Sequence, residues 1–128
     1  MKRLIAAGML ASLLHFADNT FAIDHYPEPA WITPFGVIVS WFIVTAIGIV
    51  ALTRKRRDRV FYVTAGIYAL ILLSGLLHYA FGSAMHMALR SNVTVLAEAV
   101  IGAALGLSLM SRRRRDADRS AGKPEPKP

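Results

Sequence analysis

Glu98 is the one charged residue in an otherwise apolar stretch, residues 93–110, of this 128-residue sequence. An ionisable carboxyl group in such a segment costs free energy unless it is protonated, paired with another polar group or exposed to a wet cavity. We therefore expect Glu98 to face protein rather than lipid and to have polar neighbours. A carboxyl group in that position can hold a histidine in place, contribute to a ligand site or take part in proton transfer.

His78, Ser40 and Ser74 are the candidate neighbours of Glu98. If the apolar stretches are antiparallel helices with a rise of about 1.5 Å per residue, Glu98 and His78 lie roughly 7 and 5 Å from the same end of the bundle. Ser40, six residues into the first stretch, reaches the same level. We predict a buried polar cluster of these four residues. A lock between the helices is the favoured interpretation, and a ligand site or a proton-transfer role is the alternative.

Histidine and methionine side chains indicate a second chemistry, because imidazole and thioether groups are ligands for copper. The residues Met85, His86 and Met87 follow one another between two apolar stretches, and His25 and His78 are expected on the same side. These five residues are the candidate metal ligands. Packing at a membrane surface is the competing interpretation of the methionines. Haem is the other candidate cofactor, but only His78 lies inside an apolar stretch, so a second subunit would have to supply an axial ligand.

Small residues on the third apolar stretch indicate close helix packing. Gly102 and Gly106 are four residues apart, and Ala99 and Ala103 lie beside them on the same helix face. This spacing lets a second helix approach closely. We expect the face to dock onto a partner membrane protein or onto a second copy of the chain.

Several function classes find no support in the sequence. The chain has no cysteine, which removes disulfide frameworks, Cys-ligated zinc, iron–sulfur clusters and thiol catalysis. It has no glycine-rich phosphate loop and no pair of neighbouring carboxylates suited to glycoside chemistry. The segments outside the apolar stretches are too short to form a catalytic domain. We do not expect an enzyme.

The composition of the chain indicates which secondary structure positions these side chains. Hydrophobic residues make up 55% of the chain while its net charge is +7, and a soluble domain this small would have to expose large apolar patches. The basic residues cluster beside the apolar stretches, where they orient membrane helices, so we expect a lipid bilayer and no nucleic-acid partner. Helices are the expected structure, because backbone groups in lipid must pair within their own segment.

We predict an all-α integral membrane protein, a small bundle of three transmembrane helices that follows a cleaved signal peptide. The expected segments are a signal peptide (1–22), a periplasmic segment (23–34), a first span (35–53), a cytoplasmic loop (54–59), a second span (60–81), a periplasmic loop (82–92), a third span (93–110) and a disordered basic cytoplasmic tail (111–128).

The signal peptide is inferred from the length of its apolar run. The run from Leu4 to Leu14 covers eleven residues, about half of what a membrane-spanning helix needs. Thr20 and Ala22 place small residues where a signal peptidase would cut after Ala22. The alternative is that the segment is retained, which makes a bundle of four helices.

The charge distribution orients the bundle. Of the thirteen Lys and Arg residues after Ala22, all but Arg90 lie in residues 54–59 or beyond Ser111, and such a bias marks the cytoplasmic side. We expect a multi-pass protein of a bacterial inner membrane with a periplasmic mature N-terminus and a cytoplasmic C-terminus. The leading expectation is a non-catalytic accessory, assembly or anchor subunit of a larger membrane complex. The alternatives are a periplasm-facing copper or haem accessory protein and a holin-like pore former.

Overall fold

A computed structural model describes residues 1–26, 29, 31–56, 58–82 and 87–121 of the chain. Its long helices are α1 (Lys2–Phe21), α2 (Pro34–Thr53), α3 (Arg59–Ser74) and α5 (Leu89–Ala121). Its short helices are η1 (Ile23–His25), η2 (Gly75–Leu77) and α4 (His78–Phe81). The short helices η2 and α4 follow α3 without a gap in the chain. The described part of the chain contains no strand.

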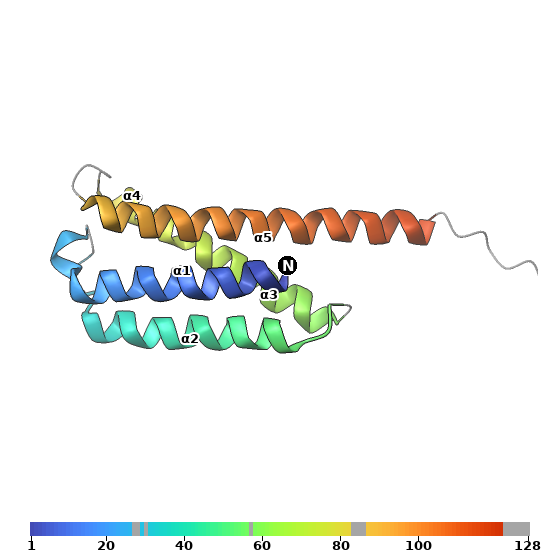
Figure 1. Cartoon of the computed structure of the whole chain (residues 1–128), viewed down its shortest axis with the longest axis horizontal. Coiled ribbons are helices and arrows are strands. Elements are labelled where there is room, and N and C mark those ends of the chain that lie inside the picture. Colours follow the sequence, from blue (N-terminus) through green and yellow to red (C-terminus); the bar gives the residue numbers. More distant parts are fainter. Residues whose placement is uncertain (27–28, 30, 57, 83–86, 122–128) are drawn as a thin grey trace, which may run out of the picture.

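The long helices pack as a ring in which each lies against two neighbours. Helix α1 packs against α2 and α5, and α3 completes the ring by packing against the same two helices. Figure 1 shows α1 between α2 and α5, with α3 behind them. Among the described residues, four segments are long and apolar enough to cross a membrane, namely Lys2–Phe21, Pro34–Thr53, Arg59–Phe81 and Leu89–Asp116.

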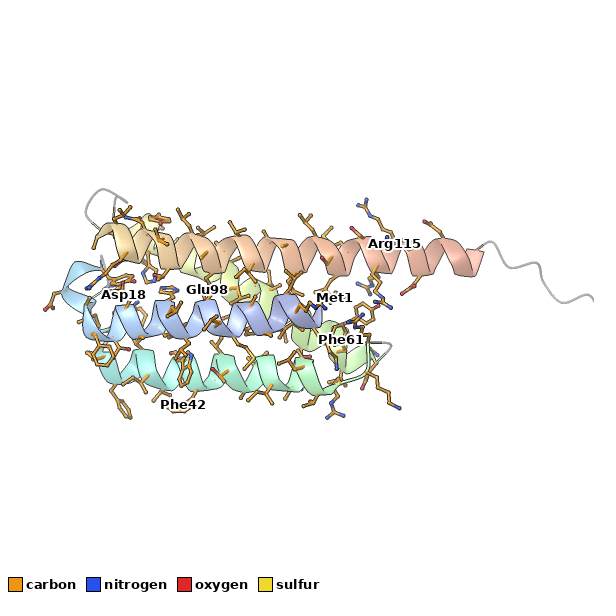
Figure 2. The ribbon with its side chains drawn as sticks, in the orientation of Figure 1. Met1, Asp18, Phe42, Phe61, Glu98 and Arg115 are labelled. Carbon is orange, nitrogen blue, oxygen red and sulfur yellow. The ribbon has the colours of Figure 1, made fainter. Side chains whose placement is uncertain are left out.

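Apolar side chains cover the outside of the bundle as well as its inside. Phe42, Leu70 and Leu107 are each more than 60% exposed. Figure 2 shows Phe42 pointing away from the bundle, whereas Glu98 lies between α5 and α1. A soluble domain rarely exposes so much apolar surface, and lipid is the solvent that suits it. The fold is therefore a small helical membrane bundle.

Small residues bring α1 and α2 close to Tyr68 in the middle of the core. A Cβ atom added to Gly8 of α1 would lie 2.8 Å from Leu72 Cδ1 and 3.1 Å from Tyr68 Cε1. A Cβ atom added to Gly48 of α2 would lie 3.2 Å from Tyr68 Cε2, on the other edge of the same ring. Ile5 of α1 is fully buried in this core. Helix α1 is thus an integral part of the packing.

Helix α1 is longer than the apolar run on which the signal-peptide prediction rests. Its 20 residues are enough to cross the hydrocarbon core of a bilayer, which is about 30 Å thick. The difference arises because the helix continues past Leu14, through the polar residues that end the apolar run. The bundle contains α1 as a fourth long helix, and cleavage after Ala22 remains a prediction.

Helices α2 and α3 begin within one residue of the starts predicted for the first and second spans. Helix α2 begins at Pro34, and the Thr33 hydroxyl caps it by accepting a backbone hydrogen bond of 3.2 Å. Helix α3 begins at Arg59, and the Asp58 carboxylate caps it in the same way at 2.9 Å. Such caps satisfy amide groups that have no partner within the helix. The second span is not one continuous α-helix, however, because η2 interrupts it.

Helix α5 is longer at both ends than the third span predicted over residues 93–110. It begins at Leu89, so the predicted loop 82–92 is shorter, and it runs to Ala121, so the first part of the predicted disordered tail is helical. Arginine is a good helix former, and two of the arginines here are followed four residues later by an aspartate, which stabilises a helix. Residues 122–128 lie outside the described part of the chain.

Candidate functional site

The two ends of the bundle differ in chemistry. One end, named the Trp31 end, carries Trp31, Asp18 and Arg90, and the other, named the Arg59 end, carries Arg59 and the arginines 112–115. The buried ionisable groups lie toward the Trp31 end. The candidate site therefore lies toward the Trp31 end.

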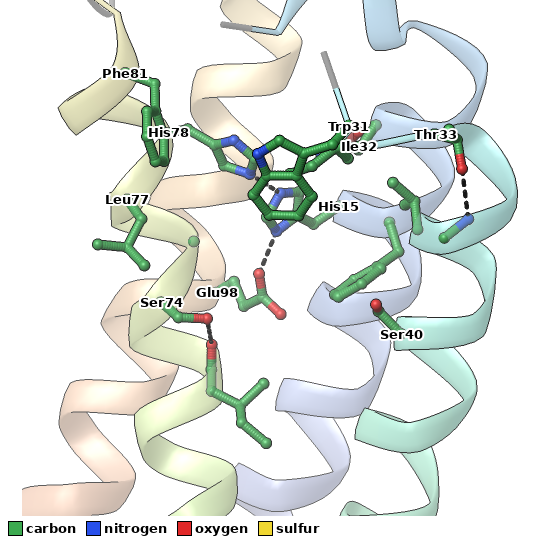
Figure 3. Close-up of a pocket in the computed structure, with 16 residues that line it drawn as sticks. His15, Trp31, Ile32, Thr33, Ser40, Ser74, Leu77, His78, Phe81 and Glu98 are labelled. Carbon is green, nitrogen blue, oxygen red and sulfur yellow. Dashed lines mark hydrogen bonds and ion pairs between the residues drawn. The ribbon is translucent and has the colours of Figure 1, made fainter. Parts of the chain in front are cut away.

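Glu98 lies on the face of α5 that packs against α1, and its side chain is almost fully buried. Its Oε2 atom contacts Nδ1 of His15, which is itself buried on α1 (Figure 3). The other carboxylate oxygen, Oε1, has no hydrogen-bond partner among the described residues. The structure thus pairs Glu98 with a residue of the segment predicted to be a signal peptide.

His78 extends this pair to a group of three side chains. Its Nε2 atom lies 3.2 Å from Nε2 of His15. His15 therefore directs one ring nitrogen toward Glu98 and the other toward His78. The predicted direct pairing of Glu98 with His78 is replaced by an indirect one, because α1 inserts its histidine between them. We call Glu98, His15 and His78 the Glu-His-His triad.

The position of His15 follows from the periodicity of α1. Residues three or four apart share one face of a helix, and the buried residues of α1 follow that spacing. They are Ile5, Gly8, Ala11, Ser12, His15 and Asn19. This face of small residues, with a polar group on each of its last turns, is the sequence signal that could have revealed His15 as a site residue.

Gly75 makes room for the triad. A Cβ atom added at this position would lie 3.2 Å from His15 Cε1 and 3.3 Å from Glu98 Oε2. Both distances are shorter than ordinary contacts, so a larger residue would push against both members of the pair. Gly75 also begins η2, so the break in the second span coincides with its contact with the His15–Glu98 pair.

Gly75→Ala is expected to destabilise the bundle by about 1 kcal/mol, because crowding of the His15–Glu98 pair outweighs the gain in helix propensity. Thermal unfolding in detergent, followed by circular dichroism, measures the change. Gly66→Ala is the matched control: an added Cβ there meets no atom within 4 Å, so stability should rise slightly. Equal effects of the two substitutions would contradict the tight fit assigned to Gly75.

Tyr26 covers the triad from the segment that follows α1. Its ring centroid lies 5.0 Å from that of His78 and 6.2 Å from that of His15. Its hydroxyl donates a hydrogen bond of 2.8 Å to Asp18 Oδ2. Burial raises the pKa of the Tyr26 phenol above its usual range, and the neighbouring Asp18 carboxylate adds to the rise. The hydroxyl therefore keeps its proton and remains a donor.

Asp18 links Tyr26 to the start of α5. The Ser91 hydroxyl, which is buried, donates to Asp18 Oδ2 at 2.5 Å, and Arg90 Nε lies 2.9 Å from Asp18 Oδ1. The Arg90 side chain is largely exposed, so its ion pair contributes little to stability. The two hydrogen bonds to Asp18 hold Tyr26 in place over the histidines.

A cavity of about 530 Å³ opens beside the triad. Its polar lining includes all three members of the triad, and Trp31 and Phe81 contribute aromatic rings to its wall (Figure 3). Phe16 lines it as well. Ser40 and Ser74, the serines of the predicted buried cluster, line the same cavity, but both are exposed rather than buried. Ser74 donates its hydroxyl to the Ile71 carbonyl of its own helix at 2.7 Å rather than to Glu98. A mostly apolar cavity with a few convergent polar groups is the usual form of a small-ligand site.

Of the five predicted metal ligands, the structure describes the side chains of His78 and Met87, and these two lie in different clusters. His78 belongs to the triad, whereas Met87 is buried in a neighbouring apolar cluster. The others lie outside the described residues: Met85, His86 and the side chain of His25. Within the described ranges, no three His, Cys, Asp or Glu side chains are arranged to hold one ion. In the part of the chain that the structure describes, two imidazole nitrogens therefore approach each other, Nε2 of His15 and Nε2 of His78.

The predicted glycine face of the third span is divided between two roles. A Cβ atom added to Gly102 would lie 2.9 Å from the Ala69 carbonyl oxygen of α3, so Gly102 packs within the chain rather than onto a partner. Ala99 is buried as well. Gly106 is different, because an added Cβ meets no atom within 4 Å, and Ala103 is exposed. Only the Gly106 part of the face is open.

The fold and the site together define a small membrane bundle in which α1, α4 and α5 contribute a Glu-His-His triad beside a mostly apolar cavity. No protein family, no curated protein and no solved structure matches this chain.

Proposed function

We propose that this protein is a non-enzymatic accessory protein of a bacterial inner membrane that holds copper(I) at the Trp31 end of its bundle. The observation that carries the proposal is the convergence of two imidazole nitrogens, Nε2 of His15 and Nε2 of His78, at 3.2 Å beside a cavity. Imidazole is a suitable ligand for copper. The proposal departs from the ligand set expected from the sequence by placing His15 at its centre.

The separation of the two nitrogens suits one shared ion. Nitrogens that lie about 2.0 Å from an ion and 3.2 Å from each other subtend about 105° at that ion, close to the tetrahedral angle. The remaining coordination positions would face the cavity. In the metal-free protein the same separation suits an N–H···N hydrogen bond, so the ion takes the place of a proton.

Glu98 supports this role through His15. Histidine ligands commonly donate their second ring N–H to a carboxylate, which sets the tautomer and orients the ring. Glu98 contacts Nδ1 of His15, so the proton resides on that side and Nε2 keeps its lone pair for the ion. The carboxylate is thus a positioning group rather than a ligand.

Charge favours copper(I) over zinc(II). An uncompensated charge in an apolar, poorly hydrated site is costly. With copper bound, an ionised Glu98 and two neutral imidazole ligands would supply one negative charge in total. Copper(I) with this set is neutral overall, whereas zinc(II) leaves one positive charge without a counter-charge.

The same geometry argues against a haem bound between the two histidines. Axial histidines lie on opposite faces of the porphyrin, so their nitrogens are about 4 Å apart, twice a metal–imidazole bond of about 2.0 Å. His15 and His78 approach to 3.2 Å. A porphyrin plane does not fit between them.

The proposal requires that α1 stays attached to the mature protein, because α1 supplies His15. The retained helix places Lys2 and Arg3 at the same end of the bundle as the other basic clusters. By the positive-inside rule that Arg59 end faces the cytoplasm, and the Trp31 end faces the periplasm. Four spans then leave both chain termini in the cytoplasm. The site lies toward the periplasmic side, where the protein would encounter loosely bound copper.

Copper(I) titration of the purified protein in detergent, against a chromophoric copper(I) chelator, tests the proposal. We expect one ion per chain, with at least tenfold weaker binding in His15→Ala and in His78→Ala. Leu76→Ala serves as the matched control, since Leu76 lies two residues from His78 on the partly exposed side. Zinc(II) should compete poorly. Failure of the wild type to compete with the chelator, or binding as tight as that of the wild type in both histidine variants, would reject the metal site.

A further inference from the structure

A second cavity lies at the opposite end of the bundle, between α3 and α5. It has a volume of about 1170 Å³. Gly66 and Gly106 form its floor, since a Cβ atom added at either position meets nothing within 4 Å. Long apolar side chains form its walls, among them Val63, Ile67, Leu70, Leu107 and Met110. We call it the α3–α5 groove.

The mouth of the α3–α5 groove is basic. Arg59 of α3 and Arg113 of α5 both line it, and both side chains are exposed. Tyr62 and Asp116 also line the mouth, where the Tyr62 hydroxyl donates to Asp116 Oδ2 at 3.4 Å. Two arginines against one aspartate leave the entrance with a net positive charge. An anionic group is the complementary ligand for that entrance.

The length of the groove matches one leaflet of a bilayer. On α5 it runs from Ala103 to Asp116, and on α3 from Arg59 to Leu73, which at about 1.5 Å per residue is about 20 Å. This is half of a bilayer about 40–45 Å thick, a thickness that includes the headgroup regions. The groove closes beyond that depth, because an added Cβ on Gly102 would lie 2.9 Å from the Ala69 carbonyl oxygen. A helix that crosses the whole membrane would not find a groove along its full length.

We propose that the α3–α5 groove binds an anionic phospholipid, with one acyl chain over Gly66 and Gly106 and the phosphate at Arg59 and Arg113. The basic mouth recognises the headgroup, and the apolar walls accommodate a chain that ends near the bilayer midplane. The phosphate-binding part of this site, at Arg59 and Arg113, lies at the opposite end of the bundle from the proposed copper site and shares no residue with it.

Native mass spectrometry of the purified full-length protein tests the lipid site, with phosphatidylglycerol and phosphatidylcholine of identical acyl chains as probes. We expect phosphatidylglycerol to remain bound at least tenfold more than phosphatidylcholine. The double variant Arg59→Gln/Arg113→Gln should abolish this preference. Arg114→Gln is the matched control, because Arg114 is an exposed neighbour that does not line the groove.

Gly106→Leu provides a second arm that leaves the headgroup site intact. Filling the floor of the groove is expected to reduce retention of both lipids. Thermal unfolding in detergent should stay close to that of the wild type, because an added Cβ meets no atom within 4 Å and the rest of the side chain extends into the groove. Equal retention of the two lipids by the wild type, an unchanged preference in the double arginine variant, or a stable dimer that Gly106→Leu disrupts would each overturn the proposal.

Discussion

The protein isolated from membranes is expected to retain Met1 and all of α1 rather than to begin at Ile23. Without α1, Glu98 would lose its partner His15, and breaking a buried ion pair by removal of one partner costs about 3–5 kcal/mol. The packing of Ile5 in the core would be lost as well. Intact-mass measurement of a protein tagged at its C-terminus distinguishes the full chain from one that lacks residues 1–22.

A substitution within α1 tests the same reasoning without removing the helix. His15→Leu keeps the segment apolar but leaves Glu98 unpaired, so the protein should unfold at lower temperature and lose copper(I) binding. Leu14→Ala, on the exposed side of the same turn, should change neither property strongly. A stable, copper-binding chain that begins at Ile23 would show that both the retention of α1 and the metal site are wrongly assigned.

Glu98→Gln is expected to weaken copper(I) binding about 10- to 100-fold, the usual effect of removing a carboxylate that orients a histidine ligand. Glutamine preserves the size of the side chain but not the negative charge that balances the ion. It also permits its amide group to donate to His15, which moves the ring proton to Nε2. The same chelator competition measures the loss, and unfolding should change much less than copper affinity.

Glu98→Ala separates the positioning role from simple packing. It removes the side chain and leaves a cavity next to His15, so both copper affinity and thermal stability should fall. Ser108→Ala, on the same helix but remote from the triad, is the matched control. If Glu98→Gln binds copper(I) as tightly as the wild type while Glu98→Ala only unfolds earlier, Glu98 acts as a lock between helices and not as a support for a ligand.

The membrane character of the fold was predictable because hydropathy and charge are properties of each segment by itself. Helices α2 and α3 begin within one residue of their predicted starts, since Thr33 and Asp58 are strong local caps. The apolar run from Leu4 to Leu14 is shorter than α1, because the helix continues through polar residues whose partners lie on other helices. His15 and Asp18 look like the end of an apolar run, whereas in the bundle they are the residues that pair with other helices.

The sequence by itself determined that the chain forms apolar helices and that the carboxyl group of Glu98 is too costly to face lipid. Only the tertiary structure decided that its partner is His15, that Gly102 packs inside the chain and that Gly106 remains open. The physical reason is the rotation of each helix about its own axis. That rotation depends on where residues such as Gly8 and Gly75 let a distant segment approach, and no single segment contains this information.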